Sequence, residues 1–279
     1  MKTKDLLGIF LFCVVIRAAC TLLIVSRYPD DEYFLNLIFQ AAAEILSILL
    51  CKLLMKIDFS EMETIFGGGI GIHKILVALT SGVILVMFTM GENAVEALIV
   101  AQYNPQRVFE IWNFRTTAQE VYPLFSLRVL GFLAVACLVA PICEELFFRG
   151  FLLRSLLQKK RLPAALIVNC SIFTALHFSH EYYISTFVFS LFLCCAYLIT
   201  RSVLFCILVH SAYNFFAFLQ NYSFNEYFIR SIDNISSPTS WVLEIFSLVF
   251  SILFILYLFF RFGKNFDWLN CRSHTVRRG

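Results

Sequence analysis

The strongest constraint on the fold is the recurrence of apolar blocks long enough to cross a membrane. The 279-residue chain is 60% hydrophobic and only 15% charged, whereas about a quarter of the residues in a soluble domain are charged. A span needs roughly 20 mostly apolar residues. We therefore expect an all-α, polytopic transmembrane helical bundle of about eight spans. The expected spans are residues 6–26, 34–55, 70–90, 124–158, 163–179, 182–200, 202–220 and 240–261.

The same pattern predicts one membrane domain over residues 1–279, with no separate soluble module. The block from Leu6 to Val25 is too long for the apolar core of a usual signal peptide, so we interpret it as a retained first span. The fourth block exceeds one span, and its last turns are expected to leave the membrane. Residues 262–279 form a basic tail.

Basic residues gather on one predicted side of the membrane. With eight spans, the basic residues before span 1 and after spans 2, 4, 6 and 8 fall on the same face, and such residues favour the cytoplasm. Both termini are therefore predicted to be cytoplasmic. Arg107 and Arg115 run against this pattern but lie in a long loop, where the rule is weak. The net charge of +3 is too small to indicate a nucleic-acid partner. The basic positions are Lys2, Lys4, Lys52, Lys56, Arg154, Lys159, Lys160, Arg161, Arg201, Arg261, Lys264, Arg272, Arg277 and Arg278.

Cysteine usage points away from a redox or thiolate-metal protein. There are ten cysteines, most of them in apolar blocks, and no C-x-x-C pair. Buried cysteine usually behaves as a small hydrophobic residue. A disulfide framework or a cysteine-based zinc site is therefore not expected.

Ionisable residues inside a span are costly and by default functional. Arg17 and Glu44 lie at similar depth on consecutive predicted spans. Because paired charges are the usual way in which buried ions are tolerated, we favour a structural ion pair between them over a catalytic role.

The fourth block contains a second group of charges. Glu145 and Arg149 are four residues apart and can pair along one helical face. Glu144 is rotated by about 100° from Glu145 and therefore points elsewhere. We interpret Glu145 and Arg149 as an ion pair that supports the structure, and Glu144 as the candidate for chemistry.

Two further blocks carry histidines. Phe173 and His177 share one helical face, as do His210 and Asn214. At the α-helical rise, His177 lies about 21 Å and His210 about 12 Å from the cytoplasmic edge. Helix tilt can cover this difference, so these residues and Glu144 are predicted to meet around a water-holding cavity.

A carboxylate, two imidazoles and an amide are the parts needed for amide hydrolysis. Glu144 can accept a proton from a water that His177 helps to orient. His210 and Asn214 can donate hydrogen bonds to a developing oxyanion. Glu144, His177 and His210 could instead hold a divalent metal such as zinc, with an open position for water. The residues alone leave both arrangements open.

The three motifs resemble those of the CPBP family, the CAAX proteases and bacteriocin-processing enzymes, also called the Abi family. The family patterns are E-E-x-x-x-R, F-x-x-x-H and H-x-x-x-N, and the chain contains all three in order. The resemblance covers about residues 125–220, the expected catalytic core. The matching positions are Glu144, Glu145, Arg149, Phe173, His177, His210 and Asn214.

The resemblance implies a glutamate-dependent intramembrane endopeptidase of a family historically called metalloproteases. Glu144 and His177 would activate water, His210 and Asn214 would stabilise the oxyanion, and Glu145, Arg149 and Phe173 would support them. The expected partners are the lipid bilayer and a membrane-associated protein or peptide, either a CAAX protein, which can be lipidated, or a peptide precursor.

Two other classes of function use the same polar residues. A non-catalytic interaction or immunity protein of the same fold would bind a partner at the cluster without cutting it. A proton-coupled transporter would use Glu144 and the histidines as a relay, but the inverted repeats common in such proteins are not evident. Asn169, two turns before His177, either faces the same cavity or bonds a neighbouring helix.

Overall fold

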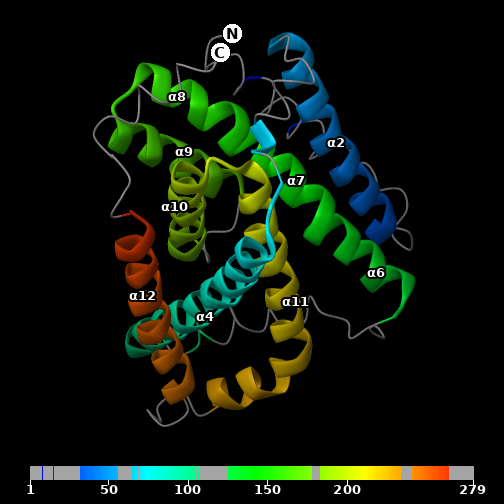
Figure 1. Ribbon diagram of the computed structural model, residues 1–279. Coiled ribbons are helices and arrows are strands. Elements are labelled where there is room, and N and C mark those ends of the chain that lie inside the picture. The colour runs from blue at the N-terminus through cyan, green and yellow to red at the C-terminus, as the bar shows by residue number, and fades with distance from the viewer. Residues whose placement is uncertain are drawn as a thin grey trace.

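The computed structural model of the chain is built from helices (Figure 1). It describes residues 32–55, 65–67, 69–104, 125–177, 183–233 and 241–263, together with the isolated positions 8, 15, 106 and 108. Within these residues the regular elements are all helical, which confirms the predicted all-α class. The elements are α2 (Glu32–Met55), α4 (Ile72–Tyr103), α6 (Leu127–Ala134), η1 (Val135–Val139), α7 (Ala140–Glu145), η2 (Leu146–Leu153), α8 (Arg154–Lys159), α9 (Leu162–Leu176), α10 (Tyr183–Thr200), α11 (Val203–Asp233) and α12 (Val242–Gly263).

Five helical stretches of the described chain are long and apolar enough to cross a membrane, rather than the eight expected. The first expected span, with Arg17, lies outside the described residues. Helices α2 and α9 contain only shorter apolar stretches. The five stretches are Ile72–Tyr103, Leu127–Lys159, Tyr183–Thr200, Val203–Gln220 and Val242–Arg261.

Two helices continue beyond the ends predicted for their spans. Helix α4 has 32 residues and ends at Tyr103, although a loop was expected after residue 90. Helix α11 reaches Asp233, although residues 221–239 were expected to be a polar loop. Hydropathy marks where an apolar stretch ends, and neither extension contains a proline that would stop a helix there. Helix α11 therefore continues beyond its apolar stretch, which ends at Gln220, whereas the apolar stretch of α4 is itself longer than expected.

Helix α9 is shorter than predicted. It has 15 residues, with a proline in its first turn, and ends at Leu176 with His177 as its C-cap. At 1.5 Å per residue it rises about 22 Å, which is less than a full hydrocarbon core. His177 therefore lies at the end of the helix rather than within it.

Helix α4 packs closely against α11 and α12, and these contacts hold the middle of the bundle together (Figure 1). A Cβ atom on Gly82 would lie 2.6 Å from the Cβ of Ala212 and 2.8 Å from the backbone nitrogen of Tyr213. Because only a glycine permits this approach, Gly82 sets the distance between α4 and α11.

The helix from Leu127 to Lys159 contains two segments with π-helical winding. The segments η1 and η2 are π-helical, and α7 lies between them. Short π-helical stretches occur often at functional sites. Here they flank the turns that contain Glu144 and Glu145.

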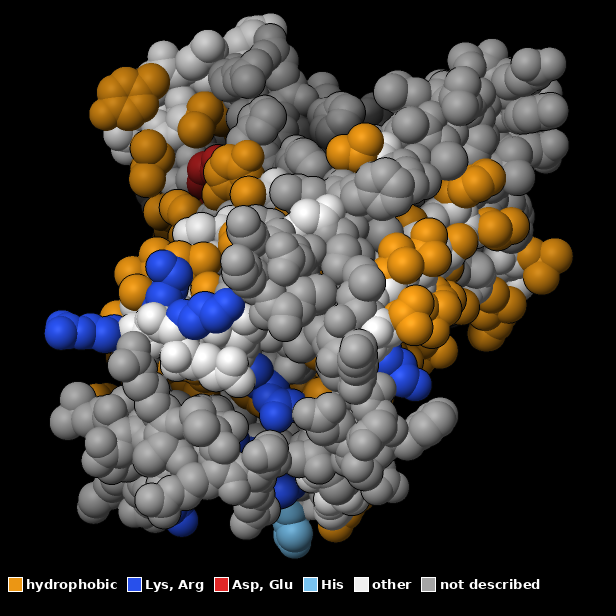
Figure 2. Space-filling model, turned by 90° about the horizontal axis from the view of Figure 1, so that it is seen from above, with side chains coloured by type: hydrophobic (Ala, Val, Ile, Leu, Met, Phe, Trp, Pro, Cys, Tyr) orange, Lys and Arg blue, Asp and Glu red, His pale blue; other side chains and the backbone are white. Residues whose placement is uncertain are grey.

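Lys and Arg side chains gather on one end of the bundle. Figure 2 views this end from above and shows the basic side chains on it. Figure 1 places α8, which ends at Lys159, at this end of the bundle, and apolar side chains are visible beside the basic ones (Figure 2). This distribution is the one expected for a membrane protein with a basic cytoplasmic face.

Glu44 is buried on α2, as its predicted depth required. Gln40, one turn earlier, donates a hydrogen bond of 3.1 Å to its Oε1 atom. The expected partner Arg17 lies outside the described residues, so the ion pair between them stays a prediction.

Candidate functional site

The centre of the candidate site is the ion pair predicted from the i, i+4 spacing. Glu145 and Arg149 are both fully buried, and Arg149 Nη1 donates to Glu145 Oε1 over 2.9 Å. A buried charge is costly unless an opposite charge and hydrogen bonds compensate it. The pair therefore explains how both charges are held inside the bundle.

The same carboxylate oxygen contacts a third group, which the sequence did not predict. His210 Nδ1, on α11, lies 2.9 Å from Glu145 Oε1. An ionised carboxylate can only accept, so Nδ1 carries the hydrogen of this bond. Through this one oxygen, Glu145 of α7 bonds both to Arg149, further along the same continuous helix, and to His210 of α11.

Arg149 also ties this centre to α10. Its Nη2 atom donates to both the backbone oxygen and the hydroxyl of Ser190, each over 3.0 Å. The guanidinium lies over the ring of Phe173, 4.9 Å from its centroid. The continuous α7–η2 helix, α10 and the last turn of α9 thus meet at one guanidinium.

An aromatic side chain lies beside both candidate histidines. The centroid of the Phe173 ring is 4.5 Å from that of His177 and 6.3 Å from that of His210. Phe189 of α10 packs edge-on to His210 at 4.9 Å. Phe173 therefore brings the two motif histidines to one region of the fold.

His177 is exposed, in contrast to the almost completely buried His210. Its Nδ1 atom lies 2.8 Å from the backbone oxygen of Phe173. Because a carbonyl oxygen only accepts, Nδ1 carries a hydrogen, and Nε2 of the neutral ring is free to accept a proton. The backbone bond thus selects the tautomer that a base requires.

Asn214 bonds to the π-helical segment before α7. Its Nδ2 atom donates to the backbone oxygen of Ala136 over 2.6 Å. In this segment Ala140 donates to Val135, five residues earlier. The next donor in that register would be residue 141, but this is a proline and has no N–H. Asn214 supplies the hydrogen bond that Pro141 cannot.

Glu144 is half-buried on α7. Its Oε2 atom is shielded from solvent and has no hydrogen-bond partner among the described residues. Oε2 of Glu145 is likewise without a partner among the described residues, so the two adjacent glutamates are distinguished by burial and by Oε1 of Glu145, which receives two hydrogen bonds. This agrees with the prediction that they point in different directions.

Several contacts of the site could not be read from the sequence. Ser190 and Phe189 belong to no motif, and α10 is uniformly apolar around them. The ring of Tyr213 packs at a tilt against that of Phe189, with centroids 4.5 Å apart, and the Tyr213 hydroxyl lies 3.1 Å from that of Thr89 on α4. Ser190, Tyr213 and Thr89 are marked in the sequence only as polar side chains inside apolar blocks, and Phe189 is not marked at all.

Of the two alternatives for Asn169, the structure shows the bond to a neighbouring helix. Asn169 is fully buried, and its Nδ2 atom donates to the backbone oxygen of Phe148 over 2.9 Å. The Cys194 thiol donates to its Oδ1 atom over 3.2 Å. Asn169 is therefore a packing residue that joins α9 to η2.

The donor set does not fit a metal centre in the arrangement described. Within the described part of the chain, no group of three His, Cys, Asp or Glu side chains is placed to hold a metal ion. Glu144, His177 and His210 were the expected ligands. We therefore derive no chemical step through a metal.

The fold and the site define a class of protein. It is a helical membrane protein in which a carboxylate, a guanidinium and an imidazole form a buried centre, with a second imidazole at the end of a short helix. Residues 126–216, which contain all of these groups, match the family model described as type II CAAX prenyl endopeptidase Rce1-like. The match confirms the resemblance to the CAAX protease and bacteriocin-processing family over this segment. Comparison with curated proteins and with solved structures gave no match.

Proposed function

We propose that the protein is an intramembrane endopeptidase that hydrolyses a peptide bond in a membrane-associated protein or peptide, of the CAAX or peptide-precursor type. The observation that carries the proposal is the carboxylate of Glu145, which holds both Arg149 and His210 within the segment that matches the protease family. The roles of the other site residues are inferred from which of their hydrogen-bonding atoms already have a partner.

Glu144 and His177 activate the water in this proposal. The Oε2 atom of Glu144 has no partner among the described side chains and is available to bind water. His177 has its Nδ1 hydrogen bonded to Phe173, so Nε2 is the acceptor. Either Glu144 or His177 takes a proton from the water as the water oxygen attacks the scissile carbonyl carbon. The same proton then passes to the leaving amine.

His210 and Asn214 stabilise the oxyanion. Because His210 Nδ1 donates to Glu145, a second donation from Nε2 requires the imidazolium form. Arg149, which is bonded to the same Glu145 oxygen, adds a fixed positive charge to this side of the site. Asn214 uses one of its two amide hydrogens on Ala136 and keeps the other for the substrate. Such fixed donors are worth the most where water is excluded.

The short helix α9 supports a water-accessible site. An α9 that starts at the basic face ends about 22 Å from it, within the hydrocarbon layer. The exposed polar group of a C-cap at that depth is tolerated only inside protein or beside water. His177 is exposed at this position, which suits a side chain that handles water.

The test is cleavage of a peptide with a prenylated CAAX terminus, and of its unprenylated counterpart, by the purified protein in detergent or nanodiscs. We expect Glu144→Ala, His177→Ala and His210→Ala each to lose cleavage. His274→Ala, in the C-terminal segment, serves as the histidine control and should cleave as the wild type does. Unchanged cleavage in all three site variants would overturn the proposal, and a folded wild type without cleavage would favour a binding role for the cluster.

A further inference from the structure

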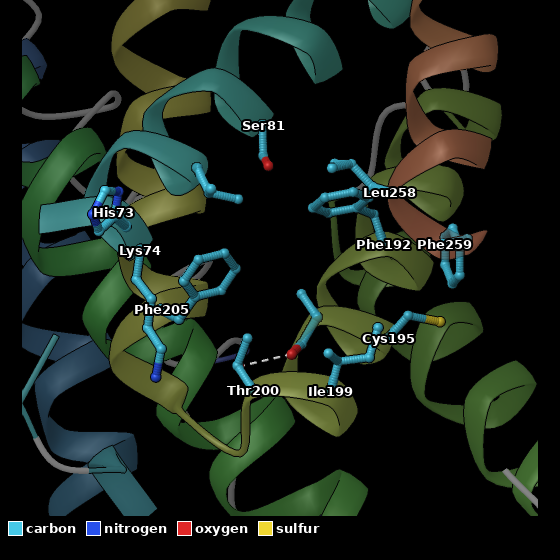
Figure 3. A pocket seen from close by; sticks show the side chains of 12 residues that line it. His73, Lys74, Ser81, Phe192, Cys195, Ile199, Thr200, Phe205, Leu258 and Phe259 are labelled. Carbon is cyan, nitrogen blue, oxygen red and sulfur yellow. Dashed lines mark hydrogen bonds between the residues drawn. The ribbon is translucent and has the colours of Figure 1, made fainter. Parts of the chain in front are cut away.

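A cavity separate from the Glu145 centre lies between α4, α10, α11 and α12. Its volume is about 430 Å³, within the range of pockets that bind small molecules. Figure 3 shows the side chains that surround it. The walls are mostly apolar, with Phe192 and Cys195 from α10, Phe205 from α11 and Leu258 from α12. Such walls fit a hydrocarbon chain.

One polar atom in this cavity has no partner. Ser81 on α4 is only 2% exposed, and its hydroxyl forms no hydrogen bond within the described structure. A serine inside a helix commonly bonds the carbonyl one turn earlier, as Thr200 does to Ala196 over 2.8 Å. The Ser81 hydroxyl instead points into the cavity (Figure 3). A ligand with an oxygen acceptor at this depth would satisfy it.

The first turn of α4 gives the cavity a cationic edge. Lys74 lines it and is exposed. Lys74 and Ser81 are seven residues apart on one helix, so their Cα atoms are about 10 Å apart along the axis. An exposed lysine beside an apolar cavity suits an anionic head on an apolar tail.

We propose that this cavity binds one acyl chain of an anionic, ester-linked glycerolipid from the surrounding bilayer. The lipid phosphate lies at Lys74, and an ester carbonyl several bonds below it accepts the hydrogen of Ser81. The chain fills the space between Phe192, Phe205 and Leu258. A plain hydrocarbon or isoprenoid chain has no oxygen at that position, so Ser81 would stay unpaired with it.

The site also has a structural connection to the candidate active site. Phe192 lies on α10 within one turn of Phe189 and Ser190, which contact His210 and Arg149. A chain bound against Phe192 therefore supports the helix that positions the guanidinium. Lipid occupancy is thus expected to stabilise the whole fold, whether or not the protein cleaves peptides.

The experiment is a titration of the full-length protein, followed by native mass spectrometry, with three lipids of equal chain length. These are diester phosphatidylglycerol, its diether analogue and diester phosphatidylcholine. We expect the diester phosphatidylglycerol to bind most tightly. Lys74→Gln should weaken it about fivefold, as expected for one lysine near an anionic surface. Ser81→Ala should abolish the preference for the diester over the diether.

Two further variants make the result decisive. Ala196→Trp, which places an indole in the cavity, should lose all three lipids, and Val77→Phe, a smaller obstruction, serves if Ala196→Trp does not fold. Lys159→Gln, a lysine away from the cavity, should bind as the wild type does. Equal affinity for the diester and the diether, undiminished binding in a folded Ala196→Trp or Val77→Phe variant, or displacement of the lipid by a prenylated peptide would overturn the proposal. Because cleavage is not measured, this result is independent of the protease assay.

Discussion

Glu145 and His210 lie 65 residues apart in the chain, yet the carboxylate oxygen of one is 2.9 Å from the Nδ1 atom of the other. The same oxygen accepts from Arg149. One atom thus joins two of the three motifs. The more buried glutamate therefore organises the centre, whereas for Glu144 the described residues supply no partner to Oε2.

Glu145→Gln should destabilise the fold and also reduce cleavage. The substitution leaves Arg149 buried without its counter-charge, and breaking such a pair costs about 3–5 kcal/mol. Thermal unfolding in detergent should show a large fall in Tm. Glu145→Leu combined with Arg149→Met should recover much of the Tm, and equal losses in the single and double variants would contradict this account of the pair.

Glu144→Gln should behave in the opposite way. Because Oε2 of Glu144 has no partner among the described residues, a neutral amide of the same shape should leave the Tm unchanged or raise it. Loss of an acid–base group typically costs about 10²–10⁴-fold in rate, so kcat for the prenylated peptide should fall by that order. A Tm as low as that of Glu145→Gln, or an unchanged kcat, would show that the two glutamates have been assigned the wrong roles.

Asn214→Ala should lose both a structural and a catalytic hydrogen bond. The carbonyl of Ala136 is left unpaired, at a cost of about 1–3 kcal/mol. Removal of an oxyanion donor typically lowers kcat by about 10²–10³-fold.

A second substitution separates these two effects. Pro141→Ala restores the backbone N–H that the π-helical register lacks. The double variant Pro141→Ala, Asn214→Ala should therefore regain Tm without regaining kcat. Recovery of both quantities together would contradict a direct role for Asn214 in the reaction.

Gly82→Ala should separate α4 from α11. The added methyl group meets the Cβ of Ala212 at 2.6 Å, so one of the two helices must shift. Tyr213 and Asn214 follow Ala212 directly, and both Tm and kcat should decrease. Gly71→Ala is the matched control, because a Cβ there has no neighbour within 4 Å and Tm should remain as in the wild type.

The sequence predicted correctly those contacts that form within a single helix. The pairing of Glu145 with Arg149 and its divergence from Glu144 follow from helical spacing alone. The span count was less secure, because hydropathy locates apolar stretches and not helix ends. Helices α4 and α11 therefore extend past their predicted limits, and α9 stops at Leu176.

The contacts between helices lay beyond the reach of sequence patterns. Neither the bond from Glu145 to His210 nor the one from Arg149 to Ser190 has a fixed spacing, since each depends on how separate helices pack. The role of Pro141 was equally hidden, because a proline in an apolar block predicts a kink and not a π-helical register with a free carbonyl. The catalytic roles of Glu144, His177, His210 and Asn214 stay predictions that the assays above decide.

The π-helical segment Val135–Val139 has one further consequence for the adjacent glutamates. A π-helical turn holds one residue more than an α-helical turn, so this segment could lose one residue, return to α-helical winding and leave Glu144 and Glu145 on their present faces. The same deletion within α7, ahead of Glu144, would rotate both glutamates by about 100°, because the turns there have no extra residue to lose. Glu145 would then occupy the position that Glu144 now has, and the carboxylate facing α11 would be lost. The widened turn thus tolerates a change of chain length that the next turn does not.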